Sequence, residues 1–136
     1  MIPSKSLEIE LNLPKPPSLN AYFNSKHWAI KVKYKKEYTK YCEEQIALYD
    51  EFTCDTYEIH IRYNSRHDVD NVILVSKFLS DTLVDKGVVK DDGNKYYKRL
   101  NIQIDKELPK DAFLVKVKCQ GVKEKHDERG KELSEL

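Results

Sequence analysis

The chain has 136 residues, of which 40% are hydrophobic and 35% are charged, and its formal net charge is +1 at pH 7. This length and composition fit one globular domain with a core of its own, and no apolar run approaches the roughly 18 residues that a membrane span needs. The N-terminus, MIPSKSLEIELNLP, alternates apolar and acidic residues, so we do not expect a signal peptide. Cys42, Cys54 and Cys119 form no CxxC pair, which indicates free thiols in a reducing cytoplasm rather than a zinc site.

The first predicted elements are a strand and a long helix. LEIELNL (residues 7–13) alternates apolar and polar residues, which is typical of a strand with one buried face. PKPPSLN then ends the strand, because proline removes a donor and fixes φ. A helix is expected from about Trp28 to Tyr49. We interpret the residues that recur in it at helical spacing as core rather than as base-stacking groups: Ile30, Tyr34, Tyr38, Tyr41 and Cys42.

A second strand, a second helix and two more strands follow. TYEIHIRYN (residues 56–64) alternates, and a helix is expected from about Asp70 to Asp85. Gly87 stands where a left-handed C-terminal cap is expected, and KDDGN is typical of a turn. RLNIQID (residues 99–105) and AFLVKVKC (residues 112–119) then alternate, with Leu100, Ile102 and Ile104 inward in the first.

The predicted order is therefore β-α-β-α-β-β, an α+β fold. Because every strand has one apolar and one polar face, we expect a mixed β-sheet of about four strands covered by two helices on one side. Residues 1–120 would form this single domain. Residues 121–136 are almost all charged, and we expect a mobile C-terminal tail or a marginal helix there.

A basic stretch leads into the first helix. Between Ser25 and Tyr41 there are six lysines and one acidic residue, Glu37. Such a stretch is suited to lie along a phosphate backbone; the alternative is a solvated helix face. The six are Lys26, Lys31, Lys33, Lys35, Lys36 and Lys40.

Carboxylates stand at both ends of the second helix, in RHDVDNVILVSKFLSDTLVDKGVVKDD (residues 66–92). If the chain folds back after its cap, Asp68, Asp70 and one of Asp91 and Asp92 would converge. Carboxylates about 4 Å apart repel one another by roughly 4 kcal/mol at an effective dielectric near 20, so the cluster would need a cation such as Mg²⁺ or Mn²⁺. Lys77, on the same helical stripe as Asp70, would then stabilise charge on a phosphoryl transition state.

Each of these residues also has a structural interpretation. Aspartate is a common helix N-cap, Asp-Asp-Gly-Asn is a favoured turn, and Lys77 and Asp81 would form an i,i+4 pair worth roughly a few tenths of a kcal/mol. A DxD pair also occurs in metal-dependent glycosyltransferases. The short chain and the lack of a glycine-rich loop disfavour a nucleotide-sugar enzyme.

Four motifs in order resemble the RusA-like Holliday-junction resolvases: PPSLN, DVDN, KFLSD and GVVKDD, between about Leu7 and Cys119. The resemblance implies a homodimeric, Mg²⁺-dependent endonuclease of phage or bacterial origin, with Mn²⁺ able to substitute, that resolves four-way DNA junctions by paired symmetric nicks. Asp68, Asp70 and Asp92 match the family's metal-binding aspartates and Lys77 its catalytic lysine. Asn71 matches the asparagine after the second aspartate. The basic stretch and Arg66 would bind the DNA.

The sequence departs from the family pattern at one place. In the family the lysine follows the second aspartate by about one helical turn, but here Leu74 stands there and Lys77 comes three residues later. Either the helix begins later, with Asn-Val-Ile before it, or the lysine is displaced. A displaced lysine would favour the alternative function, a non-catalytic relative that binds junctions or other DNA.

Overall fold

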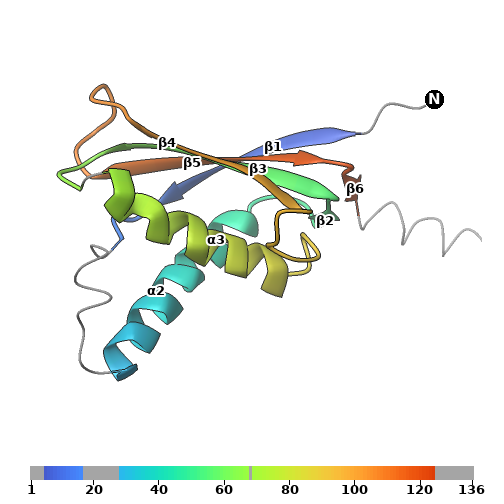
Figure 1. The fold of residues 1–136 in the computed structure, drawn as a ribbon, viewed down its shortest axis with the longest axis horizontal. Helices are drawn as coiled ribbons and strands as arrows, with labels where there is room; N and C mark the ends of the chain where they lie inside the picture. Colours follow the sequence, from blue (N-terminus) through green and yellow to red (C-terminus); the bar gives the residue numbers. More distant parts are fainter. Residues whose placement is uncertain (1–4, 17–27, 68, 125–136) are drawn as a thin grey trace, which may run out of the picture.

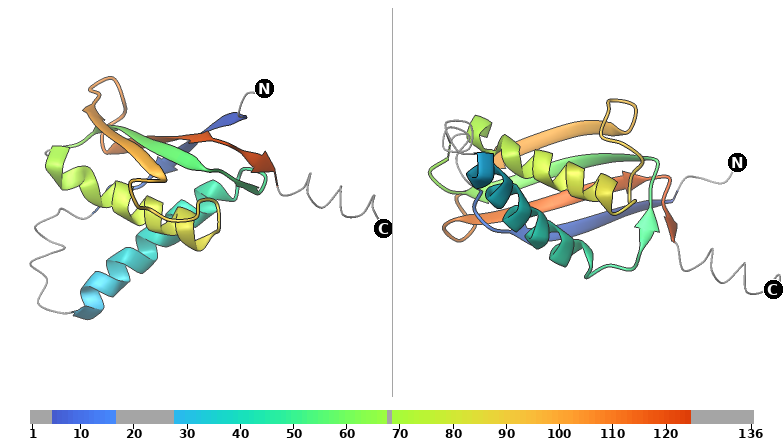
Figure 2. Two further views of the ribbon diagram at one scale, coloured as in Figure 1. Left: turned by 45° about the vertical axis from the view of Figure 1, so that its right-hand side comes forward. Right: turned by 90° about the horizontal axis from the view of Figure 1, so that it is seen from below.

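The structure is a computed structural model, and it describes residues 5–16, 28–67 and 69–124, without the side chains of Asp70 and Asn71. A mixed four-stranded sheet has the strand order β1-β5-β3-β4, and two helices cover one of its faces (Figures 1 and 2). This arrangement confirms the predicted α+β fold. The strands are β1 (Ser6–Leu13), β3 (Thr56–Asn64), β4 (Tyr97–Ile104) and β5 (Ala112–Gln120).

The pairing within the sheet is antiparallel except at one edge. β5 pairs antiparallel with β1 and with β3, whereas β4 pairs parallel with β3. A parallel pair needs a crossover connection, and the chain between β3 and β4 supplies it as a helix. A separate two-stranded ladder joins β2 (Phe52–Thr53) to β6 (Lys123–Glu124).

The core lies between the sheet and the helices. The alternation predicted for the strands is confirmed, because the inward residues of β1, β3 and β5 are nearly inaccessible to solvent. They pack against the buried side of α3 (Ile73–Asp85) and against three residues of α2 (Trp28–Ile46). The largest fully buried side chains include Tyr57, Tyr63, Phe78 and Phe113, and the rings of Tyr63 and Phe113 stack at 5.4 Å.

Helix α3 begins three residues later than predicted. The 3₁₀ helix η1 (Val69–Val72) precedes it, so the α-helix starts at Ile73 rather than Asp70. Aspartate and asparagine favour turns and caps over helix interiors, and valine is a weaker helix former than leucine or alanine. The other end is as predicted: Gly87 has a positive φ of 74°, and the N–H of Val88 donates to the carbonyl of Leu83 (3.0 Å), as in a Schellman motif.

Helix α2 contributes less to the core than its spacing predicts. It ends at Ile46 instead of Tyr49, and only Tyr38, Cys42 and Ile46 are buried. Ile30 is 41% exposed and Tyr41 is 50% exposed, so the core interpretation is wrong for these two residues. The start of α2, which includes Ile30, extends beyond the sheet (Figure 1), and Tyr41 lines a shallow hollow with Pro14 and Pro16 instead of entering the core.

Residues at and just after the C-terminal end of α2 bond part of the β1 edge of the sheet. The hydroxyl of Tyr49 accepts from the N–H of Glu10 (2.8 Å) and donates to the carbonyl of the same residue (2.9 Å). The side chain of Gln45 accepts from the N–H of Asn12 (2.9 Å). Side chains thus bond backbone groups that an edge strand otherwise leaves free for another chain.

Tyr49→Phe is expected to lower the free energy of unfolding by about 1 kcal/mol, because it removes both bonds to Glu10 at a partly exposed site. Urea unfolding followed by circular dichroism measures the change. Tyr41→Phe is the matched control, since Tyr41 is half-exposed and the described structure gives its hydroxyl no hydrogen bond. Equal midpoints for the two variants would contradict this role of Tyr49.

The predicted tail includes residues that belong to the folded part. Val122 is 6% exposed and is part of the core, and Lys123–Glu124 form β6. An alternating pattern cannot reveal a two-residue strand, which explains why the sequence did not predict β6. Residues 125–136 lie outside the described residues.

Candidate functional site

The DVDN motif lies at the N-terminal end of α3. Asp68 lies outside the described residues, and Asp70 and Asn71 lie in η1, although their side chains are not described. η1 contacts β4, and it follows the C-terminal end of β3 by a short loop. The N-cap of α3 is Val72, which makes no side-chain capping bond. The residue that precedes η1 is Asp68, so an aspartate cap at the start of this helical segment stays an expectation.

The later pair of aspartates lies in the turn before β4. Asp92 is exposed and lines a hollow with Lys35, Asp81, Val84 and Asp85, beside the C-terminal half of α3. The Asp91 carboxylate accepts from the N–H of Asp92 (2.8 Å), so Asp91 has the turn-forming role considered above.

Asp92 also lies near a buried tyrosine, Tyr57. Burial is the main cause that raises the pKa of Tyr57 above its ordinary value, followed by the charges of Tyr97 and Asp92. Tyr57 is near the start of β3 and stacks on Tyr97 at the start of β4 (4.7 Å). Asp92 is therefore close to the N-terminal ends of both strands.

Within one chain, the two groups of aspartates lie at opposite ends of α3. From Asp70 to Asp81 the helical path rises by about 18 Å, at ~2.0 Å per 3₁₀ residue and ~1.5 Å per α-helical residue. Oxygens that share one Mg²⁺ each lie about 2.1 Å from it, so one chain cannot bring Asp70 and Asp92 to the same ion. The chain does fold back beside α3 after Gly87, but it does not reach the DVDN motif, because β4 runs parallel to β3 and must start at the far end of the sheet.

No other set of described residues replaces this cluster. The described part of the chain contains no group of three histidine, cysteine, aspartate or glutamate residues arranged to hold a metal ion. Three of the four residues in the predicted site, Asp70, Lys77 and Asp92, have a described backbone position, and only Asp70 and Lys77 share a helical stripe. A metal site built on these aspartates must take oxygens from more than one copy of the chain.

Lys77 is exposed in the second turn of α3. Three 3₁₀ residues make about one turn and four α-helical residues make about 1.1 turns, so Lys77 stays on the stripe of Asp70, about 12 Å further along the axis. The structure does not show the expected i,i+4 ion pair between Lys77 and Asp81. Asp81 instead bonds Lys35 of α2 (3.2 Å), which leaves the ammonium group of Lys77 available to a ligand.

The described lysines of the basic stretch lie along α2, where Lys35 contacts Asp81 of α3. Lys26 lies outside the described residues, and Lys31 is half-buried. The other four are exposed: Lys33, Lys35, Lys36 and Lys40. Arg66 is exposed in the loop between β3 and η1, close to the DVDN motif. These positions are accessible to a large polyanion, and contact with DNA stays a prediction.

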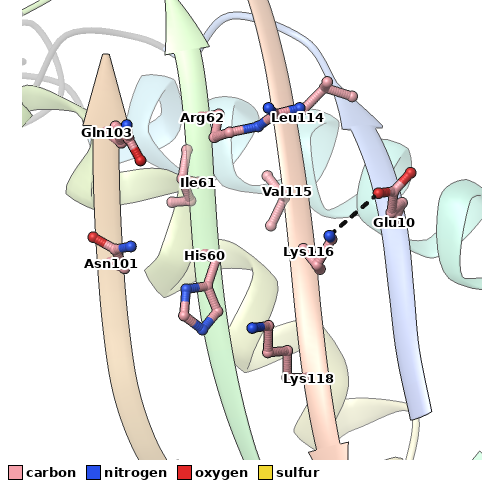
Figure 3. Close-up of a pocket in the computed structure, with 10 residues that line it drawn as sticks. All are labelled: Glu10, His60, Ile61, Arg62, Asn101, Gln103, Leu114, Val115, Lys116 and Lys118. Atoms are coloured by element: carbon pink, nitrogen blue, oxygen red, sulfur yellow. Dashed lines mark ion pairs between the residues drawn. The ribbon is translucent and has the colours of Figure 1, made fainter. Parts of the chain in front are cut away.

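The open face of the sheet carries a hollow that the sequence did not predict. It has a volume of about 200 Å³, and His60, Arg62, Lys116 and Lys118 contribute to its lining (Figure 3). Much of the positive charge is already neutralised, because Lys116 lies 3.7 Å from both Glu8 and Glu10 and Arg62 lies 3.4 Å from Asp105. Alternation identifies these residues as outward but does not reveal which charges meet across strands.

The three cysteines are free, as predicted, and all three are buried. Their sequence separation gave no sign that Cys54 and Cys119 are in contact. A hydrogen bond between them raises the pKa of Cys119, with burial adding to the effect, and lowers that of Cys54. The pair lies where β5 ends and β3 begins, at the same end of the sheet as Asp92.

In the described part of the chain, no helix is both long and apolar enough to cross a membrane. The sequence matches no protein-family model, and it matches no curated protein. The resemblance to the resolvases therefore depends on the four motifs and on the positions just described.

Proposed function

We propose that the protein is a Mg²⁺-dependent endonuclease of the RusA-like type that resolves four-way DNA junctions by paired symmetric nicks. The observation that carries the proposal is the start of α3 at Ile73. Because η1 takes up the residues before it, Lys77 stands one turn into the α-helix and remains on the stripe of Asp70. A late helix start is thus the explanation of the lysine offset that the structure favours over a displaced lysine.

The proposal requires two copies of the chain. Asp68 and Asp70 of one copy and Asp92 of the other would hold the ion, since one copy keeps these groups apart. Three carboxylates are hard oxygen donors of the kind that Mg²⁺ and Mn²⁺ prefer. When bound, the ion would supply the Lewis acidity that activates water for attack on a phosphodiester.

The other residues of the chain would bind and orient the junction. The ammonium group of Lys77 would offset negative charge on the phosphoryl oxygens in the transition state. The lysines of α2 and Arg66 would bind the phosphates of the arms, and their contribution would weaken as salt concentration rises. A dimer with a two-fold axis would present two equivalent sites to a junction of matching symmetry, as paired nicks require.

The second candidate function is a DNA-junction-binding protein without catalysis. The observation that favours it is the separation of Asp70 from Asp92 in one chain. The helical path rises by about 18 Å from Asp70 to Asp81, and Asp92 lies beside Asp81. Such a protein would bind junctions with the same salt dependence and would cut none of them, whatever divalent metal is supplied.

The wild-type protein is expected to cut a labelled four-way junction at symmetric positions when Mg²⁺ is present. It should leave the junction intact in EDTA, and it should leave a duplex of the same sequence intact in both conditions. Denaturing gels of both strands measure this. Salt-sensitive binding without cutting would support the second candidate instead, and equal cutting of junction and duplex would contradict junction selectivity.

A further inference from the structure

The outer side of β4 is an apolar surface without a partner in the described structure. Leu100 and Ile104 face the helices as predicted but are 37% and 44% exposed, because β4 is the edge of the sheet. Val69 and Ile73 are each 42% exposed, and they line a shallow hollow with Leu100 and Ile102. We call these five residues the β4 patch.

The backbone of β4 is open as well. The N–H of Asp105, just after the strand, donates to the carbonyl of Tyr63 in β3 (2.8 Å). In a parallel strand the residues bonded to the neighbour alternate, so the N–H and C=O groups of Leu100, Ile102 and Ile104 point away from the sheet. No described side chain bonds them, whereas side chains bond the β1 edge at Glu10 and Asn12.

We propose that β4 pairs antiparallel with β4 of a second copy, about a two-fold axis beside Asn101. The free backbone groups then bond each other, and Leu100 lies opposite Ile102 of the partner subunit, which gives an apolar cross-strand pair on the helix-covered face. Asn101 meets its own copy on the polar face. A surface with this alternation is self-complementary, as a two-fold interface requires.

The helices would close the interface on one side. α3 lies across β3 and β4 (Figure 2), so the two copies of α3 would lie side by side across the axis. Val69 and Ile73, which are on the side of α3 nearest β4, would be buried between them. Apolar side chains that an exposed patch leaves in water would thereby become part of a continuous core.

The pairing also bears on the proposed function, on which this part of the argument rests. The chain enters β4 shortly after Asp92, and β4 ends opposite Tyr63, near the loop that leads to the DVDN motif. Antiparallel pairing therefore brings the Asp92 end of one copy to the DVDN end of the other. The other edge of the described sheet, β1, differs because side chains bond its backbone at Glu10 and Asn12.

The first test is sedimentation velocity in the absence of metal and DNA, which keeps it independent of catalysis. We expect the wild-type protein to sediment as a dimer. Replacing both Leu100 and Ile104 with lysine should raise the dimer dissociation constant at least about 100-fold, because each substitution places a charge in the apolar interface, and the charge at position 100 would lie opposite Ile102 of the partner subunit. The control is Val32→Lys, which changes a residue of similar exposure (41%) on α2 and should stay dimeric. A monomeric wild type, or a dimeric double variant, would overturn the proposal.

The second test determines the register in which the two copies of β4 pair. Asn101→Cys places two cysteines about 4.5 Å apart at their Cα atoms, within the range of a disulfide, so mild oxidation should cross-link the dimer. Gln103→Cys places them roughly 13 Å apart along the strand and should not cross-link. The native cysteines are buried and give a low background. Cross-linking at 103 but not at 101 would overturn this pairing, while a cross-linked dimer that cuts no junction would keep the interface and remove the nuclease.

Discussion

Asp70→Asn is expected to reduce junction cleavage by about 1,000-fold or more while changing junction affinity by no more than about twofold. A loss of this size corresponds to about 4 kcal/mol of transition-state stabilisation, which fits the removal of one charged oxygen ligand from a metal site. Affinity should survive because the phosphate contacts proposed for α2 and Arg66 do not involve Asp70. Single-turnover cleavage and fluorescence anisotropy, measured on the same labelled junction, separate the two effects.

Asp85→Asn is the control for this experiment. Asp85 lies beside Asp92 in the hollow at the other end of α3, and it carries the same charge without a proposed role as a ligand. Its cleavage rate should stay within a few-fold of the wild-type rate. Wild-type activity in the Asp70→Asn variant would remove the DVDN motif from the mechanism, and melting temperatures show whether either variant is misfolded.

The parts of the fold that the sequence predicts are those governed by local patterns. TYEIHIRYN became β3 with the predicted bounds, Thr56–Asn64, because strict alternation specifies a strand with one buried face. Gly87 adopts the left-handed conformation because a residue without a Cβ fits there at little cost. Each of these outcomes depends on a few neighbouring residues, so no knowledge of the strand order was needed.

The strand order decides what the sequence could not predict. Alternation puts Leu100, Ile102 and Ile104 on the helix-covered face, but only the position of β4 at the edge leaves that face open. For the same reason the pattern cannot show that the start of α2, with Ile30, projects beyond the sheet. The periodicity of Ile30 is that of a core helix, and its exposure depends on where the sheet ends.

The candidate site also combines features set by local sequence with features set by the strand order. The sequence identifies carboxylates at both ends of one helix and a lysine on the stripe of the first pair. Whether the two ends meet depends on the parallel pairing of β3 with β4, which forces the chain to travel the length of α3 before it enters β4. Local turn chemistry at Gly87 is compatible with a return in either direction, so spacing alone could not reveal this separation.

An equal mixture of Asp70→Asn and Asp92→Asn subunits tests most directly whether the aspartates act across two copies. Each variant alone should be inactive. After subunit exchange, about half of the dimers are mixed. Each mixed dimer has one site that keeps both Asp70 and Asp92 and one site that has lost both. The number of active sites should therefore be about a quarter of the wild-type number. Cleavage should appear as single nicks instead of paired ones.

The same mixture should regain Mn²⁺ binding, measured by electron paramagnetic resonance, that neither variant has alone. Fluorescence energy transfer between labelled subunits confirms that exchange has occurred. We expect nicking to recover in the exchanged mixture. An exchanged mixture that stays as inactive as its parents would contradict it, because both aspartates would then have to act within a single chain or not at all.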